Sequence, residues 1–492
     1  MNVGPVTVSP QLRDRFQNPD RRKLLDGRPQ GFAGPRGVRA PTSVRLAAAP
    51  LLIAVGIWLA VVHPALSALP GGALVSGCLL VSYLAARRTV VAMRIYVLFV
   101  TTWFLIAPVI GEIFPSAGSG LSSFELGAVW VTVSVWLLGW SAGQALVRRH
   151  VPTGPRTRTG LSYREASSGL IFVGIVALLI EISQELHGAT AYATQVAGGA
   201  NTSITATIAS LAAPALTVGF VLRWPTASRR DRALLALLVF AQVGVGVYSG
   251  FRGPAIEFPL GVAIAYLVVH PAKLRRKALT ITSALVLIVV VGIPLTLFAN
   301  LNRQEQAAAA FGKAAPLTLA TLPRTTIQRL DEAPFLAAGL GASGPAVKQA
   351  VRMDHQIEIY VPRELWPGKP DFNYGEQIST AVYGLRASYY TSSTITWLGD
   401  LYLNGGLILV LLAGMVLAPV VRSVFEHAVE GRVVTVLTAV LLLEVILNAE
   451  APLALSLAGP IRSLLLLGAA CIAGTAICRA SARSRADSRR GR

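Results

Sequence analysis

The feature that most limits how this chain can fold is a long series of apolar segments. An α-helix of about 20 residues crosses about 30 Å of hydrocarbon, and its backbone N–H and C=O groups form hydrogen bonds with each other within the helix. Charged residues make up 14% of the 492 residues, against roughly 25% in soluble domains. The sequence therefore predicts an all-α polytopic membrane protein. The twelve spans predicted are residues 44–62, 70–86, 89–110, 124–147, 168–186, 204–222, 233–250, 254–270, 278–298, 397–420, 433–447 and 455–478.

The basic residues indicate which ends of the spans face the cytoplasm. Every second turn between spans is rich in arginine or lysine, and the short turns between these carry almost none apart from Arg252. The terminal segments 1–43 and 479–492 are basic as well, and we expect the first to be a disordered tail. By the positive-inside rule, this alternation predicts that both termini lie in the cytoplasm. The net charge of +20 is thus held at a membrane face, and no nucleic-acid partner is expected.

One long polar segment interrupts the apolar pattern. Residues 299–396 separate nine predicted spans (44–298) from the last three (397–478), and the alternation places this segment on the outer side of the membrane. It is rich in Pro, Gly, aromatic and charged residues, and we expect short helices within it, including one at 325–333. We therefore expect the functional site where this loop meets the outer ends of the spans.

Arg252 is the most informative single residue because it lies in an outer turn, where the positive-inside rule disfavours a basic side chain. Gly250 and Gly253 allow a tight turn or a close approach of the backbone to a ligand. Pro254 suits the first turn of a helix. A guanidinium at this position can bind a phosphate with two hydrogen bonds. The alternative is that Arg252 anchors its helix to lipid headgroups.

Charged side chains inside predicted spans form a second group of candidates. Such a group costs about 2.5–3.5 kcal/mol at the centre of a span, and it usually faces a cavity or a partner. Glu257 lies in the span that follows Arg252 and is a candidate for substrate binding. Glu444 and Arg462 are expected in the last two spans, where they either form a buried pair or have a functional role.

The long loop offers residues for acid–base chemistry and for sugar binding. His355 is its only histidine and a candidate general base, although a lone histidine is more often structural. Asp400 follows Trp397 by about one turn, so we expect it to face the same outer vestibule. The aromatic residues of the loop can stack on sugar rings or form a small core of the loop itself. Several of the other charged residues of the loop are expected to be solvated surface groups.

Several motifs of other chemistries do not occur in the sequence. It has no Walker-type phosphate loop, no metal-binding histidine pair and no Gly-x-Ser-x-Gly element. We therefore expect no cofactor, no metal ion, and no ATP-driven or hydrolytic mechanism.

Three motifs resemble those of the O-antigen polymerase family, the Wzy-type oligosaccharide repeat-unit polymerases. Residues 249–253 (SGFRG) are similar to the family's Arg-Gly between small residues. Residues 361–370 (VPRELWPGKP) are similar to a PR-x-x-WP-x-KP element of its outer loop. Residues 397–406 (WLGDLYLNGG) are similar to its GE-L-Y-x-N-F-G helix entry, with Asp400 in place of Glu and Gly405 in place of an aromatic residue. The order of the motifs, their location on the same outer side of the membrane, and the position of the long outer loop late in the chain also resemble the family.

The resemblance implies a metal-independent glycosyltransferase that makes a cell-envelope polysaccharide on the outer face of the cytoplasmic membrane. Its donor would be a glycan on a polyprenyl diphosphate, and its acceptor the next lipid-linked repeat unit. A partner that regulates chain length is left open. Arg252 and Arg363 would stabilise the leaving diphosphate. The general base would be Asp400, His355 or Glu376. The substrate-binding candidates are Arg252, Arg363, Trp366, Lys369, Arg386 and Glu257.

Three other activities stay open. An O-antigen ligase-type enzyme would share the topology and the donor and differ in its acceptor. A transferase using lipid-phosphosugar donors would need a catalytic acid in the first outer loop, but residues 63–69 contain no Asp or Glu. A flippase or transporter for the same lipid-linked sugar belongs to a different class. The lack of an obvious internal repeat weakens those transporter folds that are built from two similar halves.

Overall fold

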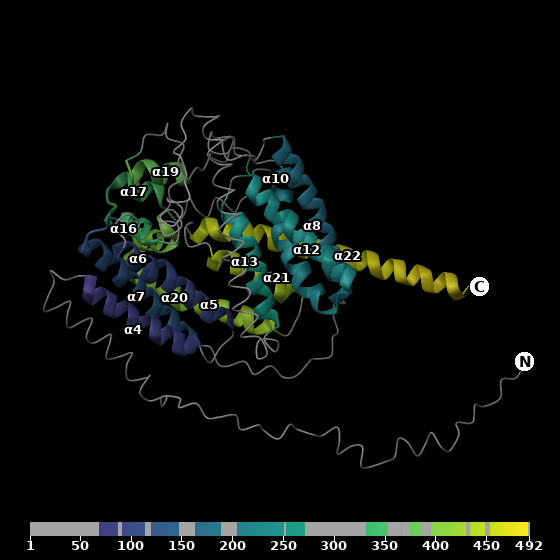
Figure 1. The fold of residues 1–492 in the computed structure, drawn as a ribbon, viewed down its shortest axis with the longest axis horizontal. Helices are drawn as coiled ribbons and strands as arrows, with labels where there is room; N and C mark the ends of the chain where they lie inside the picture. The colour runs from purple at the N-terminus through teal and green to yellow at the C-terminus, as the bar shows by residue number, and fades with distance from the viewer. Residues whose placement is uncertain are drawn as a thin grey trace, which may run out of the picture. The chain divides into compact units, whose positions relative to one another are not determined.

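The computed structural model describes the greater part of the predicted bundle and parts of the long loop, and every regular element in those residues is a helix (Figure 1). The all-α prediction is therefore confirmed for the described part of the chain. The predicted spans 44–62 and 278–298 and the tail 1–43 lie outside it. The described residues are 68–86, 91–113, 120–146, 163–187, 204–249, 252–270, 331–352, 366, 374–384, 395–429, 433–447 and 453–490.

The helices follow the predicted spans closely. Within the described residues, seven helices are long and apolar enough to cross a membrane, and three further apolar helices are shorter. This composition supports a multi-pass helical membrane protein. The helices of the bundle are α4 (Ala68–Ala86), α5 (Val91–Thr101), the π-helix η2 (Thr102–Ile106), α6 (Ala107–Ile113), α7 (Ser123–Leu146), α8 (Tyr163–Leu186), α10 (Ile204–Ala209), α11 (Ala212–Arg223), the 3₁₀ turn η4 (Trp224–Thr226), α12 (Arg229–Tyr248), α13 (Arg252–Val269), α20 (Thr396–Ala428), α21 (Val433–Leu447) and α22 (Leu453–Arg490).

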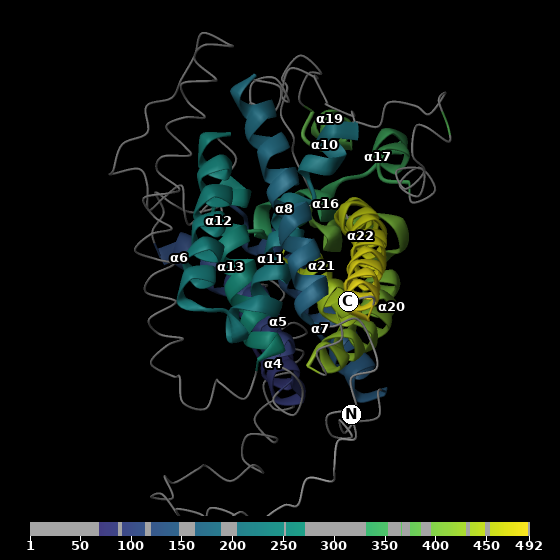
Figure 2. The same ribbon diagram turned by 90° about the vertical axis from the view of Figure 1, so that its right-hand side faces the viewer.

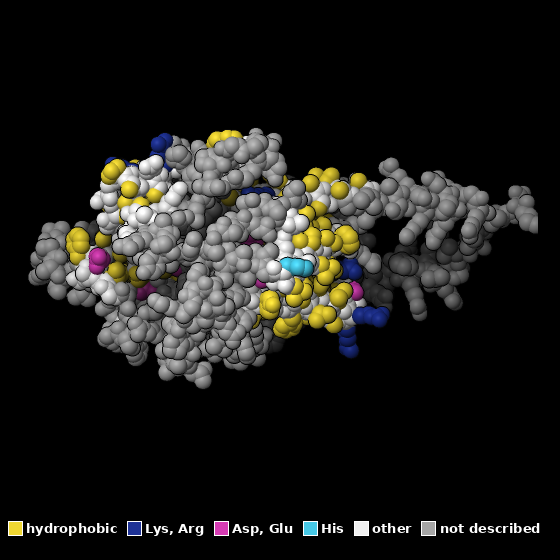
Figure 3. All heavy atoms as spheres, turned by 90° about the horizontal axis from the view of Figure 1, so that it is seen from above, with side chains coloured by type: hydrophobic (Ala, Val, Ile, Leu, Met, Phe, Trp, Pro, Cys, Tyr) yellow, Lys and Arg dark blue, Asp and Glu magenta, His cyan; other side chains and the backbone are white. Residues whose placement is uncertain are grey.

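The surface of the bundle is apolar as well as its core. Large hydrophobic side chains such as Phe172, Phe240 and Ile408 are exposed on α8, α12 and α20. Figure 3 shows hydrophobic side chains over much of the described surface seen from one end. Exposed apolar patches of this kind are uncommon on soluble monomers. Lipid is the solvent in which such a surface is stable.

Helices α7 and α20 pack very closely because α7 presents two glycines to α20. A Cβ atom added at Gly139 would overlap the carbonyl oxygen of Leu411, and one added at Gly143 would overlap that of Met415. Small residues four apart are a common device for close helix packing in membranes. This Gly-x-x-x-Gly pattern, Gly139 to Gly143, is present in the sequence.

Substitution of Gly139 by alanine should therefore destabilise the protein. The added methyl group meets backbone atoms, which move only if the helices separate, and overpacking of this kind costs about 1–3 kcal/mol. The control is Gly169→Ala on α8, where the added Cβ would meet nothing within 4 Å; there, the helix propensity of alanine should make the change neutral or stabilising. Thermal unfolding of the two purified variants measures the difference, and equal unfolding temperatures would contradict this packing.

The far ends of α7 and α20 are joined by Arg422, which also forms a buried ion pair within α20. Arg422 donates from Nε to Glu426 Oε1 at 2.8 Å and from Nη1 to the carbonyl oxygen of Gln144 at 2.7 Å. Both charged side chains are buried. The carbonyl of Gln144 belongs to the last turn of α7, where no intrahelical donor is left. Arg422 therefore caps α7 while its charge is balanced within α20.

The loop helix expected at 325–333 falls mostly on residues 325–330, which lie outside the described part, and residues 331 and 332 are not helical. The next helix of the described loop is α16 (Ala333–Gly341), where Pro334 lies at the start and favours a first turn. Of the two alternatives for Glu444 and Arg462, the structure does not support the buried pair, since both side chains are exposed.

Candidate functional site

A π-helical turn in the third predicted span is the first component of the site. A π turn displaces backbone groups from the regular helical pattern and often marks a functional position. The carbonyl oxygen of Phe104 in η2 accepts a hydrogen bond from Trp130 Nε1 at 2.7 Å. The carbonyl oxygen of Trp103 accepts one from the backbone N–H of Glu332, in the long loop, at 3.3 Å. The loop is thus attached to the irregular turn of a membrane helix.

This attachment lies well below the end of the helix. Trp103 precedes the last residue of α6, Ile113, by ten positions, which is about 15 Å along a helix. Helix α16 starts directly after Glu332 and packs against α7 and α20. Part of the long loop therefore enters the bundle instead of resting on its surface.

The second component is a break in α20. Gly406 has a φ of 61°, in the left-handed region, and with Gly405 it interrupts the helical backbone. Residues 396–404 and 407–428 are therefore two separate helical pieces. At this position a glycine is required because other residues adopt such a φ only at an energetic cost.

The two pieces of α20 cannot form one straight rod. Leu411 lies against Gly139 of α7, while the ring of Trp397 meets that of Trp136 edge-on at 4.3 Å. In a straight α20, Trp397 would lie about 21 Å from Leu411 along the helix axis. Their respective partners on α7, Trp136 and Gly139, are only about 4.5 Å apart along that helix. The first piece consequently crosses the bundle near the level of Trp136, deep within the helices.

Helix α16 covers this first piece. A Cβ added at Gly339 would lie 3.2 Å from the Cα of Gly399, so the two helices meet through glycines. The piece starts at Thr396, whose φ of 60° is unusual for a β-branched residue. Its hydroxyl accepts a hydrogen bond from the N–H of Gly399 at 3.2 Å and so caps the helix. Backbone strain of this kind costs about 1–3 kcal/mol and is concentrated at functional sites.

Three carboxylates, two before α16 and one within the covered piece, are buried. Asp331, Glu332 and Asp400 are at most 2% exposed. Asp331 Oδ1 accepts a hydrogen bond from the N–H of Ala333 at 3.1 Å, which starts α16. Asn404 Nδ2 lies 3.3 Å from Asp400 Oδ1 and donates to the carbonyl oxygens of Asp400 at 2.9 Å and Val351 at 2.8 Å. Asn404 therefore joins α20 to Val351 of the loop, while Asp331 and Asp400 each accept a hydrogen bond within their own segment.

Two further loop helices lie beside this arrangement, α17 (Pro345–Ala350) and α19 (Tyr374–Ala381), and both views show them next to α16 (Figures 1 and 2). A small hydrophobic cluster of Ala350, Val351, Ile378 and Ile395 joins them to the start of α20, and Tyr383 packs against it. Burial, with a smaller contribution from the charge of Glu332, raises the pKa of Tyr383 to about 12. Its hydroxyl therefore keeps its proton at neutral pH.

The structure places some of the predicted site residues. Asp400 lies in the covered piece, and Trp366 is exposed. Arg252 is the first residue of α13, Glu257 lies in the same helix, and Glu376 lies in α19. The predicted residues His355, Arg363, Lys369 and Arg386 lie outside the described part of the chain.

Asp400 does not line an open vestibule as we expected. Its exposed fraction is 0% because α16 lies over the first piece of α20. Asp331 and Glu332 are buried as well. An aspartate close to an Ala-Pro helix start is a typical cap, and Asp331 accepts a hydrogen bond from the N–H of Ala333. The sequence contains no signal that this cap is buried in the bundle.

Comparisons of the chain with known protein families, with curated proteins and with solved structures found no match. Any assignment of function therefore depends on the motifs and on the geometry of the site.

Proposed function

We propose that this chain polymerises lipid-linked oligosaccharide repeat units into a surface polysaccharide on the outer face of the cytoplasmic membrane. In this proposal twelve spans carry one outer loop, 299–396, and both termini are cytoplasmic. The substrates are polyprenyl-diphosphate-linked glycans that lie in the membrane.

The observation that carries the proposal is the position of the motif 397–406. These residues form the first piece of α20 and its break; residues 397–401 are buried, and the loop helix α16 packs against α20. Within a membrane, an interrupted helix is tolerated only where it is buried in protein or lines a cavity, and interrupted helices often form binding sites. The motif 249–253 is the turn between α12 and α13, where Arg252 interrupts the alternation of basic and non-basic turns. Both lie at predicted outer ends of spans.

The proposed reaction is a glycosyl transfer. A hydroxyl oxygen of the acceptor sugar attacks the anomeric carbon of the donor, the bond from that carbon to the diphosphate oxygen breaks, and the lipid diphosphate leaves with the electron pair. The hydroxyl proton passes to a general base. Arg252 and Arg363 stabilise the charge that grows on the leaving group. Trp366, which is exposed, offers a surface on which a sugar ring can stack.

The burial of Asp400 favours His355 or Glu376 as the general base. No sugar hydroxyl reaches a side chain that is 0% exposed. In the proposal Asp400 is instead a positioning residue, which holds the break in α20 through Asn404.

The variant Asp400→Asn should accordingly retain most of the polymer. Asparagine has nearly the same shape and still offers an oxygen to Asn404. Loss of a general base lowers a rate by about 10²–10⁴-fold, so a loss of that size in Asp400→Asn, at normal protein level, would make Asp400 the base. The measurement is polymer length and amount in cells, with Asp400→Leu as the variant that removes every polar contact of the side chain.

Reconstituted vesicles test the proposal against a flippase. Purified protein supplied with lipid-linked repeat units should lengthen the glycan without any water-soluble energy source. A flippase would move the lipid between leaflets and leave its glycan unchanged. Transfer of the glycan to a second lipid acceptor, without growth, would favour the ligase.

A further inference from the structure

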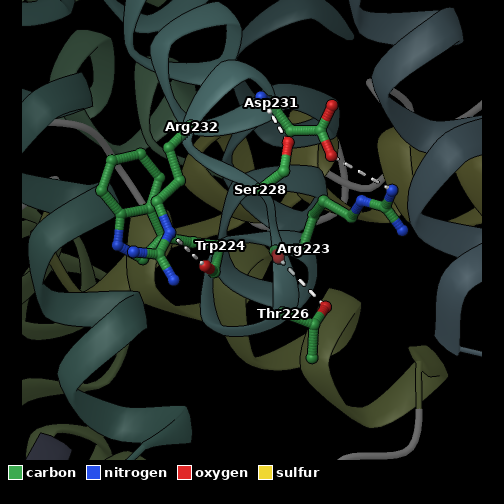
Figure 4. A network of polar contacts seen from close by, with 6 residues as sticks. All are labelled: Arg223, Trp224, Thr226, Ser228, Asp231 and Arg232. Carbon is green, nitrogen blue, oxygen red and sulfur yellow. Dashed lines mark hydrogen bonds and ion pairs between the residues drawn. The ribbon is translucent and has the colours of Figure 1, made fainter.

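The turn between α11 and α12 is a rigid basic surface at the ends of two membrane helices (Figure 4). The hydroxyl of Ser228 caps α12 by accepting a hydrogen bond from the N–H of Asp231 at 3.2 Å. The hydroxyl of Thr226 donates to the carbonyl oxygen of Arg223 at 3.3 Å. These local bonds fix the backbone that carries the basic side chains.

The one acidic side chain of this turn is already engaged. Asp231 Oδ2 lies 3.5 Å from Arg223 Nη2. Arg229, Arg230 and Arg232 are exposed. Neither Arg229 nor Arg230 makes an ion pair with another residue of the described part. The turn therefore presents three guanidinium groups whose charge it does not neutralise itself.

Trp224 fixes one of these groups and marks the depth of the turn. Arg232 donates from Nε to the carbonyl oxygen of Trp224 at 3.3 Å, and its Cζ lies 5.8 Å from the centre of the Trp224 ring. The ring also stacks on Phe220 with centroids 4.6 Å apart. Tryptophan and arginine side by side are typical of the boundary between hydrocarbon and headgroups. The outer nitrogens of Arg232 stay available because Nε makes the internal bond.

A second aromatic pair ties α13 to the same end. Tyr266 and His270 have ring centroids 4.8 Å apart, and His270 Nε2 lies 3.0 Å from the carbonyl oxygen of Val221 in α11. In the sequence, Lys273, Arg275, Arg276 and Lys277 follow directly.

We propose that the turn 223–232 is a binding site for the headgroup of an anionic phospholipid. A guanidinium group forms two parallel hydrogen bonds to a phosphate. In a zwitterionic headgroup the phosphate lies beside a positive charge, so an anionic headgroup should bind the guanidinium groups better. The turn joins the ends of two apolar helices and so lies at the membrane boundary. The ligand is therefore a phospholipid of the adjacent leaflet. This site does not depend on the proposed polymerase activity.

The test measures binding of phosphatidylglycerol and phosphatidylcholine to the purified full-length protein by native mass spectrometry. Phosphatidylglycerol should be retained preferentially by the wild type. Each arginine near an anionic surface contributes about fivefold in affinity, so the double variant Arg229→Gln with Arg230→Gln should lose about 25-fold. Lys348→Gln changes an exposed basic residue of α17 and should bind as the wild type does.

Three results would overturn the proposal. The first is equal retention of the two lipids by the wild type. The second is retention of phosphatidylglycerol by the double variant at the wild-type level. The third is competition by inorganic phosphate at equal concentration, which would make the turn a site for a soluble phosphate. Equal unfolding temperatures of wild type and double variant in phosphatidylcholine show that a loss of binding is not a loss of fold.

Discussion

Replacement of Arg252 by alanine is expected to abolish polymer growth while the protein stays in the membrane at its normal level. In the proposed reaction Arg252, at the start of α13, stabilises the diphosphate as its bond to the sugar breaks. That charge grows in the transition state, and the loss of one such donor costs about 10²–10³-fold in rate. Polymer length in cells, with protein quantified in the membrane fraction, measures the effect.

Two further variants define the role of this arginine. Arg252→Lys keeps the charge and loses the planar two-bond geometry, so it should retain short polymers only. Lys348→Ala, an exposed change in α17, should leave chain length unchanged. Polymer of wild-type length in Arg252→Ala would remove this residue from the mechanism and would favour the alternative, an anchor to lipid headgroups.

Replacement of Arg422 by alanine should produce the largest loss of stability in the described part of the bundle. The change leaves Glu426 as a buried charge without its 2.8 Å partner and the Gln144 carbonyl without its donor. Removal of one member of a buried pair typically costs about 3–5 kcal/mol. Unfolding of the purified protein in detergent, followed by tryptophan fluorescence, measures the loss.

The double variant Arg422→Met with Glu426→Leu separates this cause from a general loss of packing. Without either charge, the buried site should be close to neutral, because hydrophobic residues of similar volume often replace a buried ion pair at little cost. The double variant should therefore be more stable than Arg422→Ala alone. An additive loss from the two changes would show that the pair is not coupled in the way its geometry indicates.

The membrane helices could be predicted from the sequence because their signal is local. A run of apolar residues of the right length specifies a span whatever its neighbours are. The predicted span 433–447 coincides with α21, and the span predicted at 124–147 lies within one residue of α7 at each end. The twelve-span count stays a prediction, since two of its spans lie outside the described residues.

The candidate site could be predicted only in part because its geometry comes from contacts between distant segments. The span 397–420 was predicted as one continuous helix, whereas Gly405 and Gly406 break it, and the direction of the piece before the break depends on Trp397 meeting Trp136. Asp400 was correctly found at the start of a helix, while its burial depends on α16 packing over Gly399. The π turn at Thr102–Ile106 has no sequence signal that we used, and its carbonyls find partners in Trp130 and Glu332.

The central claim is tested most directly by the mass profile of lipid-linked glycans in a strain that lacks this gene. The account predicts that single complete repeat units accumulate on the lipid and that polymer disappears. Long polymer still attached to the lipid would contradict polymerase activity and indicate the ligase, and truncated repeat units would indicate a sugar-adding transferase. A profile identical to the wild type would contradict any role of this chain in building the glycan.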